Sequence, residues 1–300
     1  MMLANFVTQP KLMSTINSVE RTLAIDDNSS SIAPIKISLV SFEPILATSP
    51  NFILVNEFTK RRNQFIVYDE NLHKLATRSL LRTRVLDALW YDHQQHFLIL
   101  TSENVYTIDP HTGDINVLPK LIPMENKTFK TFTLLNQSTL LIAYNEWGAE
   151  YIDRWQQNVD DGIWILIERQ PLKLTSNEFI GDISTIIDTD CESLAITIYN
   201  ILTEQWRIEI RNIDTFICTR AILLPGSSLM HDYRLISVKT TESDIKWLAF
   251  SPINSKIIAI DSNWKIAQVN YNHPVQRMAL FKDNYLIVRT TERIDIHRFL

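Results

Sequence analysis

The sequence predicts an all-β protein that folds as a single β-propeller of six four-stranded blades. Short runs of β-branched and aromatic residues recur along most of the chain, and residues typical of turns bound them. The runs group into units of about 40 to 50 residues, and no helical pattern interrupts them after residue 32. An open sheet of about two dozen strands would expose its edges, whereas a propeller closes on itself.

The clearest unit covers residues 84–118. It contains four short runs, at 85–91, 97–100, 105–108 and 115–118. The last turn contains Pro110, which fixes φ, and Gly113, which can adopt positive φ. Connections this short join antiparallel strands, because a parallel return needs a long crossover. The unit is therefore a four-stranded meander of the size of one propeller blade.

Similar units precede and follow this one. We expect further four-stranded units with strands at 45–47, 52–57, 65–69 and 73–80; at 129–135, 139–144, 149–155 and 163–170; at 182–187, 193–199, 206–211 and 216–224; and at 233–240, 245–250, 256–260 and 264–270. A last unit has three strands, at 275–281, 285–289 and 294–299. Middle strands such as 97–100 are apolar throughout, which is typical of strands buried on both faces.

One run alternates instead. In residues 206–211, Arg207, Glu209 and Arg211 fall on one side of the expected strand, and apolar side chains fall on the other. Because successive side chains of a strand point to opposite faces, this alternation predicts an outer strand with one face in water.

The last unit lacks a fourth strand, and we expect the N-terminal region to supply it. Residues 35–41 alternate apolar and polar side chains and have no earlier strand to pair with. Pairing beside 294–299 would close the ring and cover an open edge. Residues 33–300 would then form the propeller domain, and residues 1–32 a short amphipathic helix and a flexible segment. A seventh blade is the alternative, and it would require strands within 1–32.

These units resemble the WD-repeat and related β-propellers over about residues 35–300. The resemblance rests on DALW at 87–90 followed by FLIL at 97–100, and on KWLAFSP at 246–252 followed by KIIAI at 256–260. An acid or amide that closes the third strand recurs as Asp69, Asp109, Asp153 and Asp214, the last of which is displaced. The Trp-Asp and Gly-His dipeptides of that family are absent. The resemblance therefore implies the architecture and carries over no functional residue.

Composition narrows the class of protein. A net charge of −5 and a charged fraction of 21% argue against disorder and against a dominant role in nucleic-acid binding. Cys191 and Cys218 are the only cysteines, and we expect two buried thiols rather than a disulfide. No segment has the pattern of a secretory signal or the length of a membrane span, so we expect a cytoplasmic or nuclear protein.

No motif predicts catalysis, a metal or a cofactor. His93, His96 and His111 fall in two different turns, without the Cys or carboxylate company that zinc prefers. The chain has no Gly-x-Ser-x-Gly motif and no glycine-rich phosphate loop. The run 160–162 (Asp-Asp-Gly) lacks the rest of a calcium loop and predicts a hairpin turn. We therefore expect no catalytic, cofactor-binding or metal-binding residue.

Function is expected in the loops. In a propeller, the loops that join second to third strands share one face with the loops that join successive blades. Basic residues beside large apolar ones are expected there, and the candidates for binding a partner are Arg61, Arg62, Trp147 and Met230. The sequence thus predicts a monomeric, non-enzymatic scaffold that binds other proteins.

Two alternatives stay open. One is a propeller enzyme of the hydrolase or lactonase type, with acids or a metal at the mouth of the central channel. The other is an RNA-binding propeller, for which the only indication is the basic cluster from Lys60 to Arg84. Clustered carboxylates or histidines around the central channel would favour the enzyme, and small or apolar groups would favour the scaffold.

Overall fold

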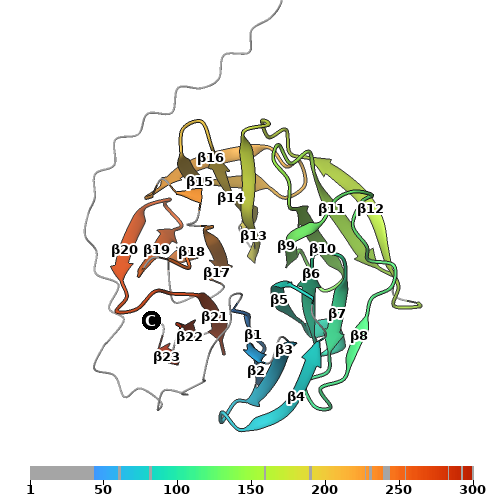
Figure 1. The fold of residues 1–300 in the computed structure, drawn as a ribbon. Coiled ribbons are helices and arrows are strands. Elements are labelled where there is room, and N and C mark those ends of the chain that lie inside the picture. Colours follow the sequence, from blue (N-terminus) through green and yellow to red (C-terminus); the bar gives the residue numbers. More distant parts are fainter. Residues whose placement is uncertain are drawn as a thin grey trace, which may run out of the picture.

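The structure is a computed structural model that describes residues 44–59, 62–80, 83–158, 160–188, 191–226, 228–229, 232–238, 244–253, 255–282, 284–291 and 293–298. Within these residues the chain forms six antiparallel sheets, arranged as blades around a common axis (Figure 1). Each sheet is a meander of strands that are consecutive in the sequence. The fold is therefore a six-bladed β-propeller, as the sequence predicts.

The first three blades contain four strands each. Blade 1 contains β1 (Leu46–Thr48), β2 (Phe52–Thr59), β3 (Arg62–Asp69) and β4 (Lys74–Leu80). Blade 2 contains β5 (Val85–Tyr91), β6 (His96–Thr101), β7 (Val105–Ile108) and β8 (Ile115–Val117), with a short 3-10 helix, η1 (Asp92–Gln94), after β5. Blade 3 contains β9 (Phe129–Leu134), β10 (Thr139–Tyr144), β11 (Tyr151–Gln157) and β12 (Trp164–Pro171).

Blades 4 and 5 repeat this arrangement. Blade 4 contains β13 (Glu178–Asp188), β14 (Cys191–Asn200), β15 (Gln205–Asn212) and β16 (Cys218–Leu224). Blade 5 contains β17 (Arg234–Ser237), β18 (Ile245–Phe250), β19 (Lys256–Asp261) and β20 (Ile266–Asn270). Blade 6 contains β21 (Arg277–Phe281), β22 (Tyr285–Arg289) and β23 (Ile294–Arg298) among the described residues.

Apolar clusters lie between the blades, because the middle strands are buried on both faces. Residues 140–143 of β10 show the arrangement: Leu140 and Ile142 pack against blade 2, whereas Leu141 and Ala143 pack against blade 4. Equivalent clusters join each remaining pair of neighbours, including blade 6 to blade 1. Each fully buried Leu or Ile contributes roughly 1.5–3 kcal/mol to stability.

The alternating strand β15 differs from its prediction. Glu209 and Arg211 are buried, and their side of the strand packs against blade 3. The Arg211 guanidinium donates to the Leu172 carbonyl at 3.2 Å and, through Nε, to the Glu209 carboxylate at 3.0 Å. Arg207 donates to the same carboxylate at 2.8 Å. The alternation correctly identified residues that share one face, but mutual ion pairing allows this face to be buried.

The hairpins between third and fourth strands share one local device. In each of blades 1 to 5, an Asp or Asn at the end of the third strand accepts a hydrogen bond from a backbone N–H two to four residues later. These residues are Asp69, Asp109, Asn158, Asn212 and Asp261. The prediction is correct for Asp69 and Asp109. It is wrong for Asp153, which is buried within β11, and for Asp214, whose expected role Asn212 takes.

Two arginine side chains of blade 6 form hydrogen bonds with the start of blade 1. Arg289 at the end of β22 is fully buried and donates to the Ile45 carbonyl at 2.6 Å and to the Asn56 side chain at 2.9 Å. Arg277 at the start of β21 donates to the Pro44 carbonyl at 2.9 Å. The chain therefore enters blade 1 in contact with blade 6. The strand expected at 35–41 and the helix expected within 1–32 lie outside the described residues.

We predict that residues 35–41 stabilise the ring whereas residues 1–30 do not. Deleting residues 1–30 should leave the melting temperature close to that of the full chain. Deleting residues 1–42 should lower it clearly, because β23 has no fourth strand beside it among the described residues. Thermal unfolding followed by circular dichroism measures both effects. Equal melting temperatures for the two truncated proteins would contradict the prediction.

Candidate functional site

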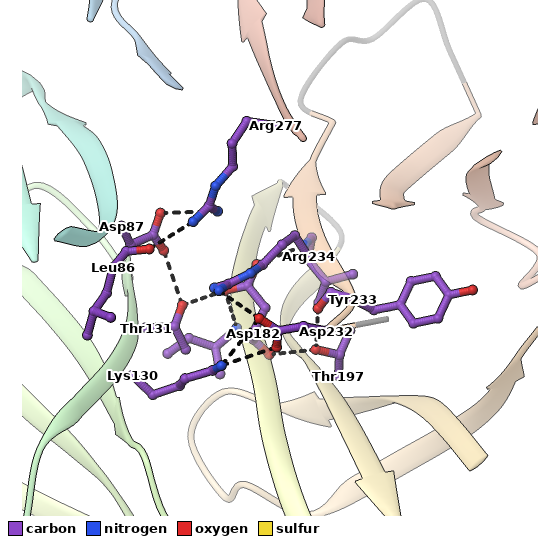
Figure 2. A network of polar contacts seen from close by, with 12 residues as sticks. Leu86, Asp87, Lys130, Thr131, Asp182, Thr197, Asp232, Tyr233, Arg234 and Arg277 are labelled. Carbon is purple, nitrogen blue, oxygen red and sulfur yellow. Dashed lines mark hydrogen bonds and ion pairs between the residues drawn. The ribbon is translucent and has the colours of Figure 1, made fainter. Parts of the chain in front are cut away.

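Polar side chains gather around the ring axis, close to the first residues of the inner strands (Figure 2). We call this set the axial belt, and it consists of Asp87, Lys130, Thr131, Asp182, Asp232, Arg234 and Arg277. The inner strands follow the loops that join successive blades. The belt therefore lies toward the face formed by these loops and by the loops between second and third strands, which we call the loop face.

β-Bulges place three of the belt residues. The register shifts by one residue in β5, β9 and β13, which leaves Leu86, Lys130 and Gly181 as the extra residues. The residues that follow them are Asp87, Thr131 and Asp182. A bulge re-aims the neighbouring side chains and takes one residue out of the ladder. The same irregularity in three neighbouring blades thus turns three polar side chains toward one another.

Gly181 permits the tightest of these bulges. A Cβ atom at this position would lie 2.7 Å from Thr197 Oγ1 and 2.7 Å from Cζ3 of Trp206. Trp206 is fully buried, and Thr197 Oγ1 donates to the Tyr233 carbonyl at 2.9 Å. Neither neighbour is free to move away. Only glycine therefore lets β13 approach the rest of its own sheet this closely.

The carboxyl group of Asp182 lies at the centre of the belt. Its Oδ1 accepts from the Ile183 backbone N–H at 3.0 Å and contacts the Thr131 hydroxyl, while its Oδ2 accepts from the Leu235 backbone N–H at 2.8 Å. Thr131 Oγ1 also lies 3.2 Å from Asp87 Oδ2. These contacts connect the inner strands of blades 2, 3, 4 and 5.

Two cations of the belt pair with the carboxylates of Asp182 and Asp232. Lys130 Nζ lies 3.1 Å from Asp232 Oδ1, and Nη2 of Arg234 lies 2.9 Å from Asp232 Oδ2. Arg234 Nη1 is 3.9 Å from Asp182 Oδ1. These groups are largely buried, so pairing offsets part of the cost of removing them from water.

Arg277 extends the belt to the remaining blades. Its Nη1 lies 3.6 Å from Asp87 Oδ1, and its Nη2 donates to the Leu86 carbonyl at 2.8 Å. The bulge at Leu86 makes this contact available to a side chain of blade 6. With the bond from Arg277 to Pro44, the belt reaches all six blades.

The electrostatic environment shifts the pKa values of the belt groups. Burial raises the pKa of Asp182, Arg234 opposes this shift, and the charge of Asp87 adds to it. Burial alone would raise the pKa of Asp232, but Arg234 and Lys130 outweigh it and lower that pKa. Burial, assisted by Arg234, lowers the pKa of Lys130. The pKa values of Asp182 and Asp232 are therefore shifted in opposite directions.

The axial belt is not evident from the amino-acid sequence. Its members come from five blades, and no spacing along the chain connects them. One signal was present, because an isolated glycine inside a strand pattern indicates a bulge or a close approach. Gly181 directly precedes Asp182, an acid next to an apolar run.

The structure describes two of the four predicted partner-binding residues, Trp147 and Arg62. Trp147 lies in the loop between β10 and β11, is 43% exposed and packs on Phe179 with ring centroids 5.5 Å apart. Arg62 is exposed at the start of β3. Arg61 and Met230 lie outside the described residues. Trp147 and Arg62 thus both lie toward the loop face, in blades 3 and 1, and their role in binding a partner stays a prediction.

The cysteine expectation is partly wrong. Cys218 is a free and exposed thiol, because β16 is an outer strand with mostly exposed side chains. The described residues contain no group of three or more His, Cys, Asp or Glu side chains that could hold a metal ion. Within the same residues, no helix is long and apolar enough to cross a membrane.

Comparisons with known proteins agree with the fold and assign no family. No family model matches the chain, and no curated protein matches its sequence. Among solved structures, a streptogramin B lyase is similar over 89% of this chain and 97% of its own, with a TM-score of 0.56 and 9% identity. A hydrazine synthase of Kuenenia stuttgartiensis is similar over 88% of this chain and 78% of its own, with a TM-score of 0.58 and 12% identity. A chain of a mitotic checkpoint complex is similar over 97% of this chain and 99% of its own, with a TM-score of 0.58 and 10% identity. These proteins include both enzymes and an assembly, so the likeness concerns the propeller fold alone.

We predict that Asp182 is required for the stability of the ring. Asp182→Ala removes acceptors from two backbone N–H groups and a hydroxyl, and it leaves Arg234 with one carboxylate fewer. Unfolding in urea should show a loss of about 3 kcal/mol. The matched control is Asp114→Ala in an exposed hairpin, which should change stability by less than about 0.5 kcal/mol. Equal effects of the two substitutions would contradict a structural role for the belt.

Proposed function

We propose that this protein is a non-enzymatic scaffold that binds other proteins through its loop face. The observation that carries the proposal is the placement of exposed, large apolar side chains. On the loop face they are Ile122, Trp147, Ile201, Leu202, Leu229 and Ile253. Among the described residues of the opposite loops, the only such side chain is Ile217; the others lie on outer strands.

The chemistry of these side chains fits an interface with protein. They come from loops of blades 2 to 5, and Leu202 is 74% exposed at the tip of a hairpin. Exposed apolar residues that gather on one face are typical of interaction surfaces. Trp147 adds an aromatic anchor, and Arg62 and Arg84 provide exposed charges in the first two blades. Leu121, by contrast, is buried beneath its own loop.

A propeller enzyme is the second candidate, because three carboxylates gather at the ring axis. This clustering is what the enzyme alternative predicts. However, Asp232 is paired with Lys130 and Arg234, and Asp182 accepts two backbone N–H groups. A carboxylate held in this way is a poor general base for activating water. We therefore favour binding over hydrolysis.

We predict that Leu202→Glu weakens capture of the main partner. A charge at the tip of the loop would have to lose its water in the interface, and the expected loss of affinity is about tenfold or more. The tagged chain is used to purify partners from the native cell, and quantitative mass spectrometry compares the variants. The matched control is Ile217→Glu, because Ile217 is 65% exposed on the opposite loops. Equal capture by both variants would refute binding through the loop face.

We also predict that the basic start of β3 contributes to the same interface. Replacing Arg61 and Arg62 by Glu should weaken the main partner by more than about 1 kcal/mol through charge reversal. The melting temperature should stay close to that of the natural chain, because Arg62 is exposed. The same capture experiment measures the effect. Unchanged capture of every partner would exclude a contribution from these arginines.

A further inference from the structure

Donors and acceptors of the axial belt are not equally satisfied. Among the described residues, Nη1 of Arg234 has no hydrogen-bond partner, although the side chain is about nine-tenths buried. Nη1 of Arg277 is 3.6 Å from its nearest carboxylate, which is longer than a hydrogen bond. By contrast, both oxygens of Asp182 and both oxygens of Asp232 accept from protein donors. The belt therefore has unused cationic donors and few unused acceptors.

A proton count points in the same direction. The Thr131 hydroxyl carries one proton, yet its oxygen lies within hydrogen-bond distance of both Asp87 and Asp182. Both contacts can be hydrogen bonds only if one carboxyl group keeps its proton. Burial raises the pKa of Asp182, which agrees with a proton shared in this contact. A shared proton would reduce the negative charge that faces Lys130, Arg234 and Arg277.

The unused donors lie close to one another and within reach of solvent. Lys130 and Arg234 pair with the same carboxylate, that of Asp232. Arg277 lies beside Asp87, which contacts the Thr131 hydroxyl together with Asp182. The side chains of Lys130, Arg234 and Arg277 are 13%, 10% and 11% exposed to solvent. The Lys130 ammonium also lies 4.8 Å from the centre of the Phe179 ring, on which Trp147 packs. This region thus adjoins the loop face.

We propose that the axial belt binds a carboxylate group, with Arg234 and Arg277 as its hydrogen-bond donors and Lys130 as a neighbouring cation. Planar guanidinium groups suit the two oxygens of a carboxylate. A carboxylate brings a single negative charge, whereas a doubly charged phosphate would be repelled more strongly by Asp87 and Asp232 nearby. The carboxylate belongs either to a free small molecule or to an acidic side chain of a bound protein. The site itself does not depend on the proposed function.

The test uses the full-length protein and small carboxylates as probes. Acetate and succinate should raise the melting temperature in a saturable manner at constant ionic strength, because a ligand that binds only the folded state stabilises it by mass action. Acetamide, which has the same shape without the charge, should not. A rise that chloride or sulfate reproduces at equal ionic strength would show a general salt effect and would overturn the proposal.

Matched variants locate the effect. Lys130→Gln and Arg234→Lys should each weaken acetate and succinate by about tenfold. The control Lys282→Gln removes an exposed cation that pairs with Glu70 and lies outside the belt, and it should leave binding unchanged. Because Arg234→Lys keeps the positive charge, it remains informative if neutral substitutions of arginine fail to fold. Equal binding by natural chain and belt variants would overturn the assignment.

A competition experiment separates the two sources of the carboxylate. If it belongs to a bound protein, saturating succinate and Lys130→Gln should both reduce capture of partners by the tagged chain. If it belongs to a free small molecule, capture should stay unchanged while succinate still binds the belt. If the proposed function is wrong, Leu202→Glu should leave capture of partners unchanged. The belt variants leave Leu202 in place, so the two proposals can fail independently.

Discussion

Each middle strand of this propeller is apolar on both faces, so no blade can be buried without a neighbour on each side. In β10, successive side chains pack alternately on blade 2 and blade 4. In an open row of such blades, the first and the last blade would each expose an apolar face, and closure into a ring buries both faces. The cluster between blades 1 and 6 and the buried Arg289 cover these two faces. Ring closure is thus a requirement of the apolar pattern itself.

The ring axis imposes the opposite requirement, because six inner strands converge there and their polar backbone groups need partners. The bulges in β5, β9 and β13 meet this need by turning side chains inward. Buried ionic groups add little net stability, since desolvation offsets most of their attraction. They do restrict geometry, because the hydrogen bonds and ion pairs that the belt makes depend on how the blades are placed. The apolar clusters hold the blades together, and the axial belt adds polar contacts between their inner strands at the axis.

The sequence was sufficient to predict blade number, strand order and most strand bounds. Runs such as 97–100 are apolar on both faces, and only a few architectures bury both faces of a strand. The sequence was less informative where different residues serve one purpose. Asn212 performs in blade 4 the turn-forming role of Asp109 in blade 2, although the sequence pattern had indicated Asp214, two residues later. Alternation in β15 showed which side chains share a face but not what covers them.

The axial belt could not be predicted, because its contacts depend on ring closure and on one-residue register shifts. Asp87 and Asp182 lie two blades apart in the sequence, yet both contact the Thr131 hydroxyl. A rigid, partly unsatisfied set of donors lies at the axis, while the apolar side chains lie on loops around it. A protein partner that covers the loops would exclude water from these donors, and a carboxylate would then gain most from meeting them.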